Sequence, residues 1–211
     1  MNLLFVASDR MELRHLRRPG DDIRTVANGA GAHRAAAAVD EALRNFHPEA
    51  LISMGFCGAL DPSLAIGDIV VATTVFAADR AFPAEPPVTS MPHRAGPVRT
   101  ADRVVATAEE KKQLHSTGAI AVEMEAAGVA QRAQKLGVPF FCIKSVTDLA
   151  DETMANDFNA VLRSDGRFDT MKVLLSSLRH PWVRLPELFR LQRRCALAAR
   201  SLGEFIADCR F

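Results

Sequence analysis

The sequence predicts an α/β fold: a single domain over residues 1–211 whose central, mostly parallel mixed sheet is flanked by helices. Short apolar runs alternate along the chain with longer segments of helical periodicity, which is typical of a sheet covered by helices. Most of these runs are continuously apolar, as expected of parallel strands buried on both faces. The length of 211 residues and the hydrophobic content of 48% suit one domain with a complete core.

The first half of the chain contains four predicted strands and one predicted helix. The strands are runs of apolar or β-branched residues, at 3–7, 23–27, 50–54 and 69–75. An Ala-rich helix follows the second strand over residues 33–46, before Pro48. Five prolines in the segment 80–99 predict a surface loop or lid there.

The second half continues the alternation. Thr107 and Glu110 form a predicted capping box at the start of a helix, and Gly137 ends a later one. Up to residue 146 we predict a short strand from residue 102, a helix that ends at 114, a strand end at 119–123, a helix at 126–136 and a buried strand at 140–146. A helical stretch follows at 158–178, interrupted at Gly166. The C-terminal tail starts near residue 181 with a break at 181–186 and continues as a final amphipathic helix at 187–208.

Composition excludes several classes of protein. A formal net charge of +1 argues against a nucleic-acid partner, which needs a clear basic excess. Runs of apolar residues stay below the roughly 18 that a membrane span needs, and the first residues lack the basic region of a signal peptide. The four cysteines are far apart and lack metal-ligand spacing, so we expect a reduced, cytoplasmic setting and no metal.

Two glycine-containing turns follow predicted strands, where α/β proteins bind ligands. In the first, residues 28–31, glycines leave backbone amides free to approach an anion or a sugar, and an ordinary tight turn is the alternative. Arg34 stands where the third glycine of a dinucleotide fingerprint would be, which argues against a Rossmann oxidoreductase and its cofactor. The second turn, residues 55–58, has the same two interpretations.

Acidic residues follow three other predicted strands. Glu123 and Glu125 flank Met124 at a helix start, where acids also simply stabilise the helix dipole. Asp148 ends the most buried strand; a carboxyl there is costly unless it is solvated or functional, and burial can make it a proton donor near neutral pH. Its other interpretation is a helix N-cap. Glu12, after the first strand, is by itself most simply a solvated residue.

Three ordered segments resemble motifs of the nucleoside phosphorylase and nucleosidase superfamily. Residues 55–71, GFCGALDPSLAIGDIVV, resemble its GxxGGLxPxLxxGDIVV segment, and AVEMEA at 121–126 and SVTDLAD at 145–151 resemble two further signatures. The resemblance covers about residues 1–155. Within the superfamily the chain is most similar to methylthioadenosine/S-adenosylhomocysteine nucleosidases and to hopanoid-biosynthesis-associated phosphorylases, the latter through residues 100–125 and the Arg- and Leu-rich tail.

The resemblance implies roles for individual residues. Asp148 matches the acid that protonates the purine N7, with Thr147 as an orienting hydroxyl beside it. Glu125 matches the carboxylate that holds the ribose hydroxyls, Met124 packs on the sugar, and Glu123 is expected to point toward the base.

Further matches surround the base and the nucleophile. Phe56, Cys57 and Gly58 match the turn lining the base pocket, and Arg103 and Val104 fall at positions that contact the base in the nucleosidases. Glu12 matches the general base that activates water.

The resemblance therefore implies an enzyme that cleaves the N-glycosidic bond of a purine nucleoside, with adenine favoured because residue 148 is Asp and with a 5′-substituent on the sugar. The reaction builds positive charge on the ribose, as in glycoside hydrolysis. Glu12 favours water as the nucleophile. Inorganic phosphate, as in the hopanoid-associated branch, is the alternative nucleophile, and it is favoured by the turn at Gly29 and by Arg10, Arg34 and Arg99. A non-catalytic purine-binding protein is the other alternative. We expect a homo-oligomer, with a dimer favoured.

Overall fold

The computed structural model describes residues 1–18, 22–163, 165–178 and 180–211. The strands are β1 (Asn2–Ala7), β2 (Asp22–Ala27), β3 (Ala50–Ala59), β4 (Ile69–Ala77), β5 (Arg80–Pro83), β6 (Arg94–Thr100), β7 (Ala121–Glu123) and β8 (Phe140–Asp148). The helices are α1 (Ala32–Ala42), α2 (Ala108–His115), α3 (Ala126–Leu136), α4 (Phe158–Val161), α5 (Thr170–Ser177) and α6 (Pro181–Asp208).

The strands form one mixed sheet in the order β2-β1-β3-β7-β6-β4-β5, and β8 pairs with both β3 and β4. These pairings close a ring, β3-β7-β6-β4-β8, so one end of the sheet curls into a small barrel while β1 and β2 extend from it. Among the strands that the structure describes, five pairings are parallel and three antiparallel. The predicted α/β class, with a mostly parallel mixed sheet, is confirmed.

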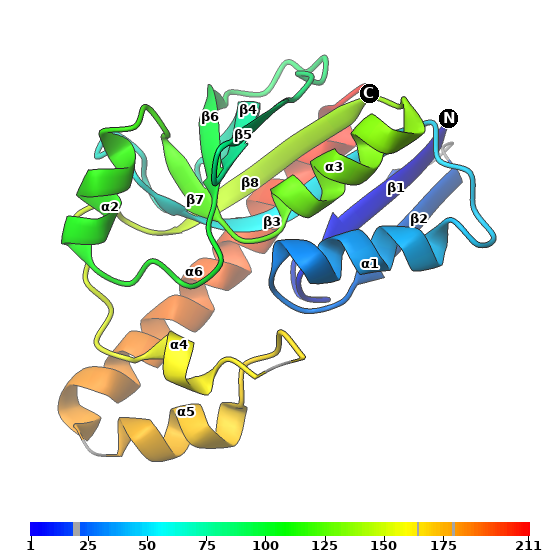
Figure 1. Cartoon of the computed structure of the whole chain (residues 1–211). Helices are drawn as coiled ribbons and strands as arrows, with labels where there is room; N and C mark the ends of the chain where they lie inside the picture. The colour runs from blue at the N-terminus through cyan, green and yellow to red at the C-terminus, as the bar shows by residue number, and fades with distance from the viewer. Residues whose placement is uncertain (19–21, 164, 179) are drawn as a thin grey trace.

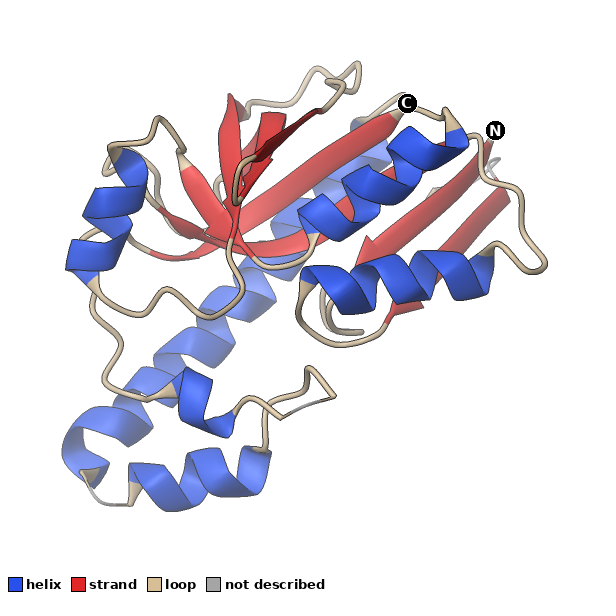
Figure 2. Ribbon diagram, viewed as in Figure 1, coloured by secondary structure: helices blue, strands red, loops and turns tan. Residues whose placement is uncertain are grey.

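Helices cover both faces of the sheet (Figures 1 and 2). The alternation of side chains along β1 shows how the sequence makes two cores. Leu4 and Val6 face the core beneath α1 and α3, where Val39 and Val129 pack. Leu3 and Phe5 face the opposite core, which the second half of α6 closes with the residues Leu202, Phe205 and Ile206.

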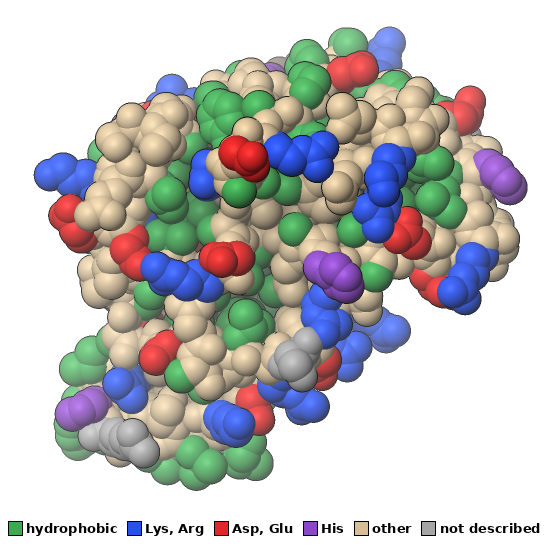
Figure 3. Space-filling view, viewed as in Figure 1, with side chains coloured by type: hydrophobic (Ala, Val, Ile, Leu, Met, Phe, Trp, Pro, Cys, Tyr) green, Lys and Arg blue, Asp and Glu red, His purple; other side chains and the backbone are tan. Residues whose placement is uncertain are grey.

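A helical lobe made of α4, α5 and the first half of α6 projects from the sheet (Figure 1). Gly166, with φ of 70°, lies between α4 and α5, so the interruption that was predicted at this glycine is confirmed. Apolar side chains reach the surface of this lobe (Figure 3). Within the described residues, none of the helices has the length and apolarity to cross a membrane.

Strand β3 is longer than the predicted 50–54, because the glycine turn expected at residues 55–58 is part of the strand. Gly55 and Gly58 both pair with β8, opposite Lys144 and Asp148, and the register shifts between Cys57 and Gly58. A β-bulge of this kind bends a strand and is frequent beside active sites.

The predicted loop at 80–99 is wrong at both ends, where β5 and β6 form. The two strands tolerate proline for different reasons. Pro83 is the last residue of β5, which is the edge strand beside β4. Pro97 lies where the β4–β6 register shifts, and a missing N–H costs least at such a bulge. Only residues 84–93 connect the two strands.

Two other predictions need correction. No strand forms at residue 102, because side chains hold this segment in place of a ladder: both backbone groups of Val104 bond the amide of Asn159. The predicted break at 181–186 is also absent, since α6 begins at Pro181. Proline suits the first helical position, and Pro186 sits on the exposed side of the second turn.

Two helix ends were predicted correctly, whereas α1 ends at Ala42 and not at residue 46. Helix α3 has the predicted bounds, and Gly137 ends it in the left-handed conformation with φ of 69°. The capping box of α2 is also confirmed: the Thr107 hydroxyl accepts from the Glu110 amide, and the Glu110 carboxylate accepts in return.

Candidate active site

A cavity of about 200 Å³ lies beyond the carboxyl ends of β1, β3, β7 and β8. It brings together all the residues predicted to be catalytic or to bind the nucleoside: Glu12, Phe56, Cys57, Gly58, Arg103, Val104, Glu123, Met124, Glu125, Thr147 and Asp148. Met154, in the loop after β8, and Phe168, between α4 and α5, line the same cavity and were not selected by the sequence analysis.

Asp148, the last residue of β8, is buried and held at both carboxyl oxygens. Lys111 Nζ lies 2.5 Å from Oδ2, and the hydroxyl of Thr147 donates to Oδ1 at 3.1 Å. Burial raises the pKa of Asp148, against the lowering effect of the Lys111 ammonium and the Thr147 hydroxyl. The carboxyl therefore keeps a proton to a higher pH than an exposed Asp does.

Lys111 was missed by the sequence analysis. It lies on α2, its side chain is 0% exposed, and its Nζ also donates to the Leu149 carbonyl at 2.6 Å. A lysine that is fully buried needs such partners, because burying an unpaired charge is costly. Its neighbour Lys112 is exposed, and nothing in the sequence distinguishes the two.

Glu12, in the turn after β1, is buried and surrounded by donors. Its Oε2 accepts from the Ser8 amide at 2.7 Å, the Ser8 hydroxyl at 3.0 Å and the Asp9 amide at 3.0 Å. Among the described residues, the one donor to its Oε1 is the Phe56 amide, at 2.9 Å. A carboxylate oxygen has two lone pairs, so Oε1 keeps one for a further donor such as water.

The two glycines of β3 make room for the two carboxyl groups. A Cβ at Gly55 would lie 2.6 Å from Glu12 Oε1, and a Cβ at Gly58 would lie 2.7 Å from Asp148 Oδ2. Both distances are shorter than van der Waals contact, so a side chain at either position would displace a carboxyl group. The glycine motif therefore places an acid and a base beside one strand.

Glu123 corrects one prediction, because its carboxylate is not turned toward a base. Its side chain is fully buried and accepts from the amides of Glu125 and Ala126 at 2.9 and 2.8 Å, at the start of α3. Lys144 Nζ lies 2.9 Å from Oε2, and the Thr100 hydroxyl donates to Oε1. The helix-start interpretation thus describes Glu123.

Glu125 has the opposite orientation, away from its own helix and across to α1. Its Oε1 accepts from the Gly31 amide at 3.0 Å, where the N-terminus of α1 favours negative charge. Lys144 Nζ lies 3.8 Å from Oε2. Burial raises the pKa of Glu125 to about 7, with the nearby charges of Glu123 and Glu12 adding to it and Lys144 opposing it. This carboxyl therefore changes charge near neutral pH.

The turn predicted to hold phosphate uses its amides within the protein. The amide of Gly29 donates to the Ser8 carbonyl at 3.0 Å, that of Ala30 to the Gly166 carbonyl at 2.7 Å, and that of Gly31 to Glu125. The anion that this turn binds in the structure is therefore Glu125 itself.

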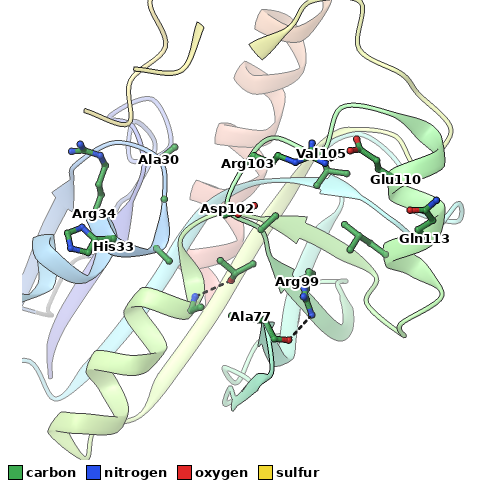
Figure 4. Close-up of a pocket in the computed structure, with 17 residues that line it drawn as sticks. Ala30, His33, Arg34, Ala77, Arg99, Asp102, Arg103, Val105, Glu110 and Gln113 are labelled. Atoms are coloured by element: carbon green, nitrogen blue, oxygen red, sulfur yellow. Dashed lines mark hydrogen bonds and ion pairs between the residues drawn. The ribbon is translucent and has the colours of Figure 1, made fainter. Parts of the chain in front are cut away.

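A second cavity of about 850 Å³ adjoins the first and shares Ala30, Arg103 and Val105 with it. Figure 4 shows His33 and Arg34 on one side of this cavity and Arg103 on the other. Arg34 and Arg99 thus line one space, as the phosphate hypothesis requires, but it is not the space that holds Asp148 and Glu12. Arg10 lines neither cavity, and Arg103 is paired with Glu110.

The small cavity also contains one thiol, that of Cys57. Burial raises the pKa of Cys57 well above its ordinary value, so its thiol stays neutral. Among the residues that the structure describes, no group of three or more His, Cys, Asp or Glu side chains is placed to hold a metal ion.

The chain matches a known protein family. The family model of the phosphorylase superfamily matches residues 11–92 and 84–168 of the chain. The chain belongs to the phosphorylase superfamily. The matched range includes every residue of the small cavity except Ser8, so the site lies within the part of the chain that defines the superfamily.

Several proteins that are similar to this chain are named as nucleosidases or hydrolases. A 5′-methylthioadenosine/S-adenosylhomocysteine nucleosidase from Marinomonas sp. (strain MWYL1) is 28% identical over 174 residues, or 68% of this chain and 75% of the relative. The futalosine hydrolase of Helicobacter pylori strain 26695 has a TM-score of 0.71 at 16% identity, over 99% of this chain and 96% of that chain. A 5′-methylthioadenosine/S-adenosylhomocysteine nucleosidase from Neisseria meningitidis, in complex with methylthio-immucillin-A, has a TM-score of 0.68 at 20% identity, over 98% of each chain. The two structural likenesses show the superfamily fold.

Proposed function

We propose that this chain is an enzyme that cleaves the N-glycosidic bond of a 5′-substituted adenine nucleoside with water, releasing adenine. One observation carries the proposal: a buried acid, Asp148, and a carboxylate with a spare lone pair, Glu12, line the same small cavity. The reaction needs both a proton for the leaving purine and a base for the attacking water. The names of the relatives support this assignment.

Asp148 supplies the proton. As the bond from C1′ to N9 breaks, its electron pair moves into the purine, and the Asp148 proton passes to N7 so that adenine leaves neutral. The raised pKa keeps this proton on Asp148 to a higher pH than an exposed Asp would hold it. Once ionised, the carboxylate can accept a hydrogen bond from the exocyclic amine of adenine, which favours adenine over 6-oxopurines.

Lys111 acts through Asp148 as a positioning residue. Its ammonium, 2.5 Å from Oδ2, lowers the pKa of Asp148 against the effect of burial. It therefore stabilises the carboxylate that remains when the proton has left, and it fixes the direction of the carboxyl group. Without it, Asp148 would hold its proton more tightly and transfer it less readily.

Glu125 holds the ribose hydroxyls, and Met124 packs on the sugar. One lone pair of Glu125 Oε1 accepts the hydrogen bond from the Gly31 amide, and the remaining lone pairs of the carboxylate can accept from two hydroxyl groups. A bidentate contact of this kind fixes the sugar relative to Asp148 and Glu12.

Glu12 makes water the preferred nucleophile over phosphate. It takes a proton from water as the oxygen attacks C1′. A phosphate dianion would meet the carboxyl groups of Glu12 and Glu125 in the same cavity, and it would be repelled by each of them that is ionised. The amides that would have compensated for this repulsion are already bonded within the protein.

Phosphorolysis, the hopanoid-associated role, is the second candidate. The observation that favours it is the arginine-lined larger cavity, where Arg34, Arg99 and Arg103 lie beside the first. In the hydrolytic scheme this cavity instead accommodates the 5′-substituent. The homodimer and the cytoplasmic location stay predictions.

The test of the proposed function is adenine release from a panel of nucleosides, with and without inorganic phosphate. We expect release from adenosine, 5′-methylthioadenosine and S-adenosylhomocysteine without phosphate, and slower cleavage of inosine. Faster cleavage of inosine would contradict the base assignment. Binding of these nucleosides without any cleavage would favour a non-catalytic purine-binding protein.

Replacement of Lys111 by Met is expected to lower kcat by about 10–100-fold, since a charge-assisted hydrogen bond contributes about 1.5–3 kcal/mol. The basic limb of the pH–rate profile, where Asp148 loses its proton, should move to higher pH, because the ammonium that lowers the pKa of Asp148 is gone. A merely structural lysine would change stability without moving this limb. Lys112→Met, at the exposed neighbour, is the control. An unmoved limb in a folded Lys111→Met variant would contradict the role.

Replacement of Glu125 by Gln is expected to reduce the preference for ribose over 2′-deoxyribose substrates by about 10–100-fold, the effect of one hydrogen bond to a charged group. In the unchanged protein the preference itself should fall as the pH drops through about 7, where Glu125 gains a proton and loses acceptor capacity. The ratio of kcat/KM values, measured on both sides of that pH, tests both effects. A ratio that is constant with pH and unchanged in the variant would show that Glu125 does not contact the sugar.

A further inference from the structure

The helical lobe carries most of the exposed large hydrophobic side chains of the described chain. Of the twelve large hydrophobic side chains that are exposed among the described residues, seven lie between residues 168 and 189. Trp182, the one tryptophan of the sequence, is 91% exposed. Clustered exposure of this kind marks a surface that contacts something, whereas single exposed apolar residues need no explanation.

The exposed side chains form one stripe on each helix. Along α5 and the residue that follows it they are Met171, Leu175 and Leu178, at the i, i+4 and i+7 spacing of a single helix face. On α6, Trp182 and Phe189 are seven residues apart, which also places them on one face. We call these five side chains the apolar patch. Figure 3 shows apolar side chains along the lower edge of the lobe.

The charge of the same segment is strongly positive. Residues 163–194 contain eight Lys or Arg and three Asp or Glu, a formal charge of +5, whereas the whole chain has +1. Lys172 and Arg190, which follow the patch residues Met171 and Phe189 in the sequence, are exposed, and so is Arg193, four residues after Phe189.

The acids of the segment are bonded within the protein. The buried Glu187 accepts from the amides of Ala155 and Asn156 at 2.7 and 2.8 Å, and Asp169 accepts from the Lys172 amide at 3.0 Å. Asp165 lies 3.5 Å from Arg163. The surface that the lobe offers to a partner is therefore apolar and cationic together.

We propose that the lobe docks on an anionic lipid bilayer through the apolar patch, with Lys172, Arg190 and Arg193 contacting the headgroups. Amphipathic helices with an apolar face, neighbouring basic residues and an aromatic residue at the interface bind bilayers in this way. A second copy of the chain fits less well, because a twofold contact would place each cationic patch against itself. An acidic polypeptide would match the charges but not the protruding tryptophan, which suits the interface between headgroups and acyl chains.

Docking would leave the catalytic groups in place. The patch residues are absent from the linings of both cavities, while Glu187 and the Arg194–Glu152 ion pair, at 2.6 Å, fasten α6 to the loop after β8. Variants of the patch should therefore bind bilayers less and still cleave a dissolved nucleoside at the original rate.

Tryptophan fluorescence tests the proposal directly, because the chain has one tryptophan and no tyrosine. The full chain is titrated with phosphatidylcholine vesicles that contain or lack phosphatidylglycerol, and co-sedimentation is measured in parallel. We expect a blue shift of the Trp182 emission and co-sedimentation with the anionic vesicles alone, both weakened by added salt. Absence of both signals with anionic vesicles, or equal signals with neutral ones, would overturn the proposal.

Variants separate the two parts of the surface. Arg190→Glu with Arg193→Glu, and Leu175→Ser with Phe189→Ser, should each lower the vesicle-bound fraction about tenfold or more. The matched controls, Arg200→Glu and Leu136→Ser, are exposed outside the patch and should bind as the parent does. Equal losses in the controls would contradict the assignment. A blue shift produced by polyglutamate, or by raising the protein concentration without lipid, would identify another partner and overturn it too.

Discussion

Replacement of Asp148 by Asn is expected to lower kcat by about 10²–10⁴-fold, the usual contribution of a general acid, with a much smaller change in KM. The amide has nearly the same shape and can still bond the base, but it has no proton of suitable acidity for N7. Because the leaving purine then departs as an anion, the loss falls on the chemical step. Initial rates of adenine release over a range of substrate concentrations separate the two constants.

The control for this variant is Asp151→Asn, an exposed residue three positions along the chain. A second variant is needed because Asp148→Asn leaves the buried ammonium of Lys111 without its carboxylate, which destabilises a protein by about 3–5 kcal/mol. The double variant Lys111→Met with Asp148→Asn removes both charges and should recover much of the lost Tm while staying inactive. Turnover near that of the parent in either folded variant would remove Asp148 from the role of acid.

The fold was predictable where local chemistry decides it. The C-terminal end of α3 follows from Gly137, and the start of α2 follows from the side chains of Thr107 and Glu110. The errors arise where tertiary pairing overrides a local preference. Pro97 is typical of a loop in the sequence, but it lies at the β4–β6 bulge, where a strand residue can lack an N–H group at little cost. Gly55 reads as a turn residue, but in β3 it leaves space for the carboxylate of Glu12.

The site was predictable as a set of residues and less so as an arrangement of charges. The motifs gave Asp148, Glu125 and Glu12, which the structure places around one cavity. The two buried lysines were missed, although one left a signal: Lys144 interrupts the apolar strand at 140–146, and a charge there needs a buried partner. Burial lowers the pKa of Lys144, and Glu123 and Glu125 more than reverse this, so the residue stays charged and organises both acids. Lys111 left no such signal, because α2 has hardly any apolar face to orient it.

Replacement of Glu12 by Gln is expected to lower the rate of adenine release in phosphate-free buffer by about 10²–10⁴-fold, the range for loss of a general base. The amide cannot take a proton from water at the position of Oε1. The rate of Glu12→Asp should lie between those of the parent and of Glu12→Gln. The shorter side chain keeps the negative charge but withdraws it from the position that Phe56 and Gly55 define. Glu204→Gln, exposed on α6, is the control.

The products distinguish this role from that of a residue beside a phosphate site. With Glu12 activating water, the sugar product is the free ribose derivative, and added phosphate leaves both the product and the rate unchanged. Ribose-1-phosphate formed only when phosphate is present would show phosphorolysis and would assign the anion site to the arginine-lined cavity. The side-chain amide that Glu12→Gln introduces can present a donor to the backbone amides of Ser8 and Asp9, where the carboxylate presents an acceptor, so the Tm of this variant must be compared with that of Glu12→Asp. An unchanged rate in a folded Glu12→Gln variant, without phosphate, would end the case for water activation by this carboxylate.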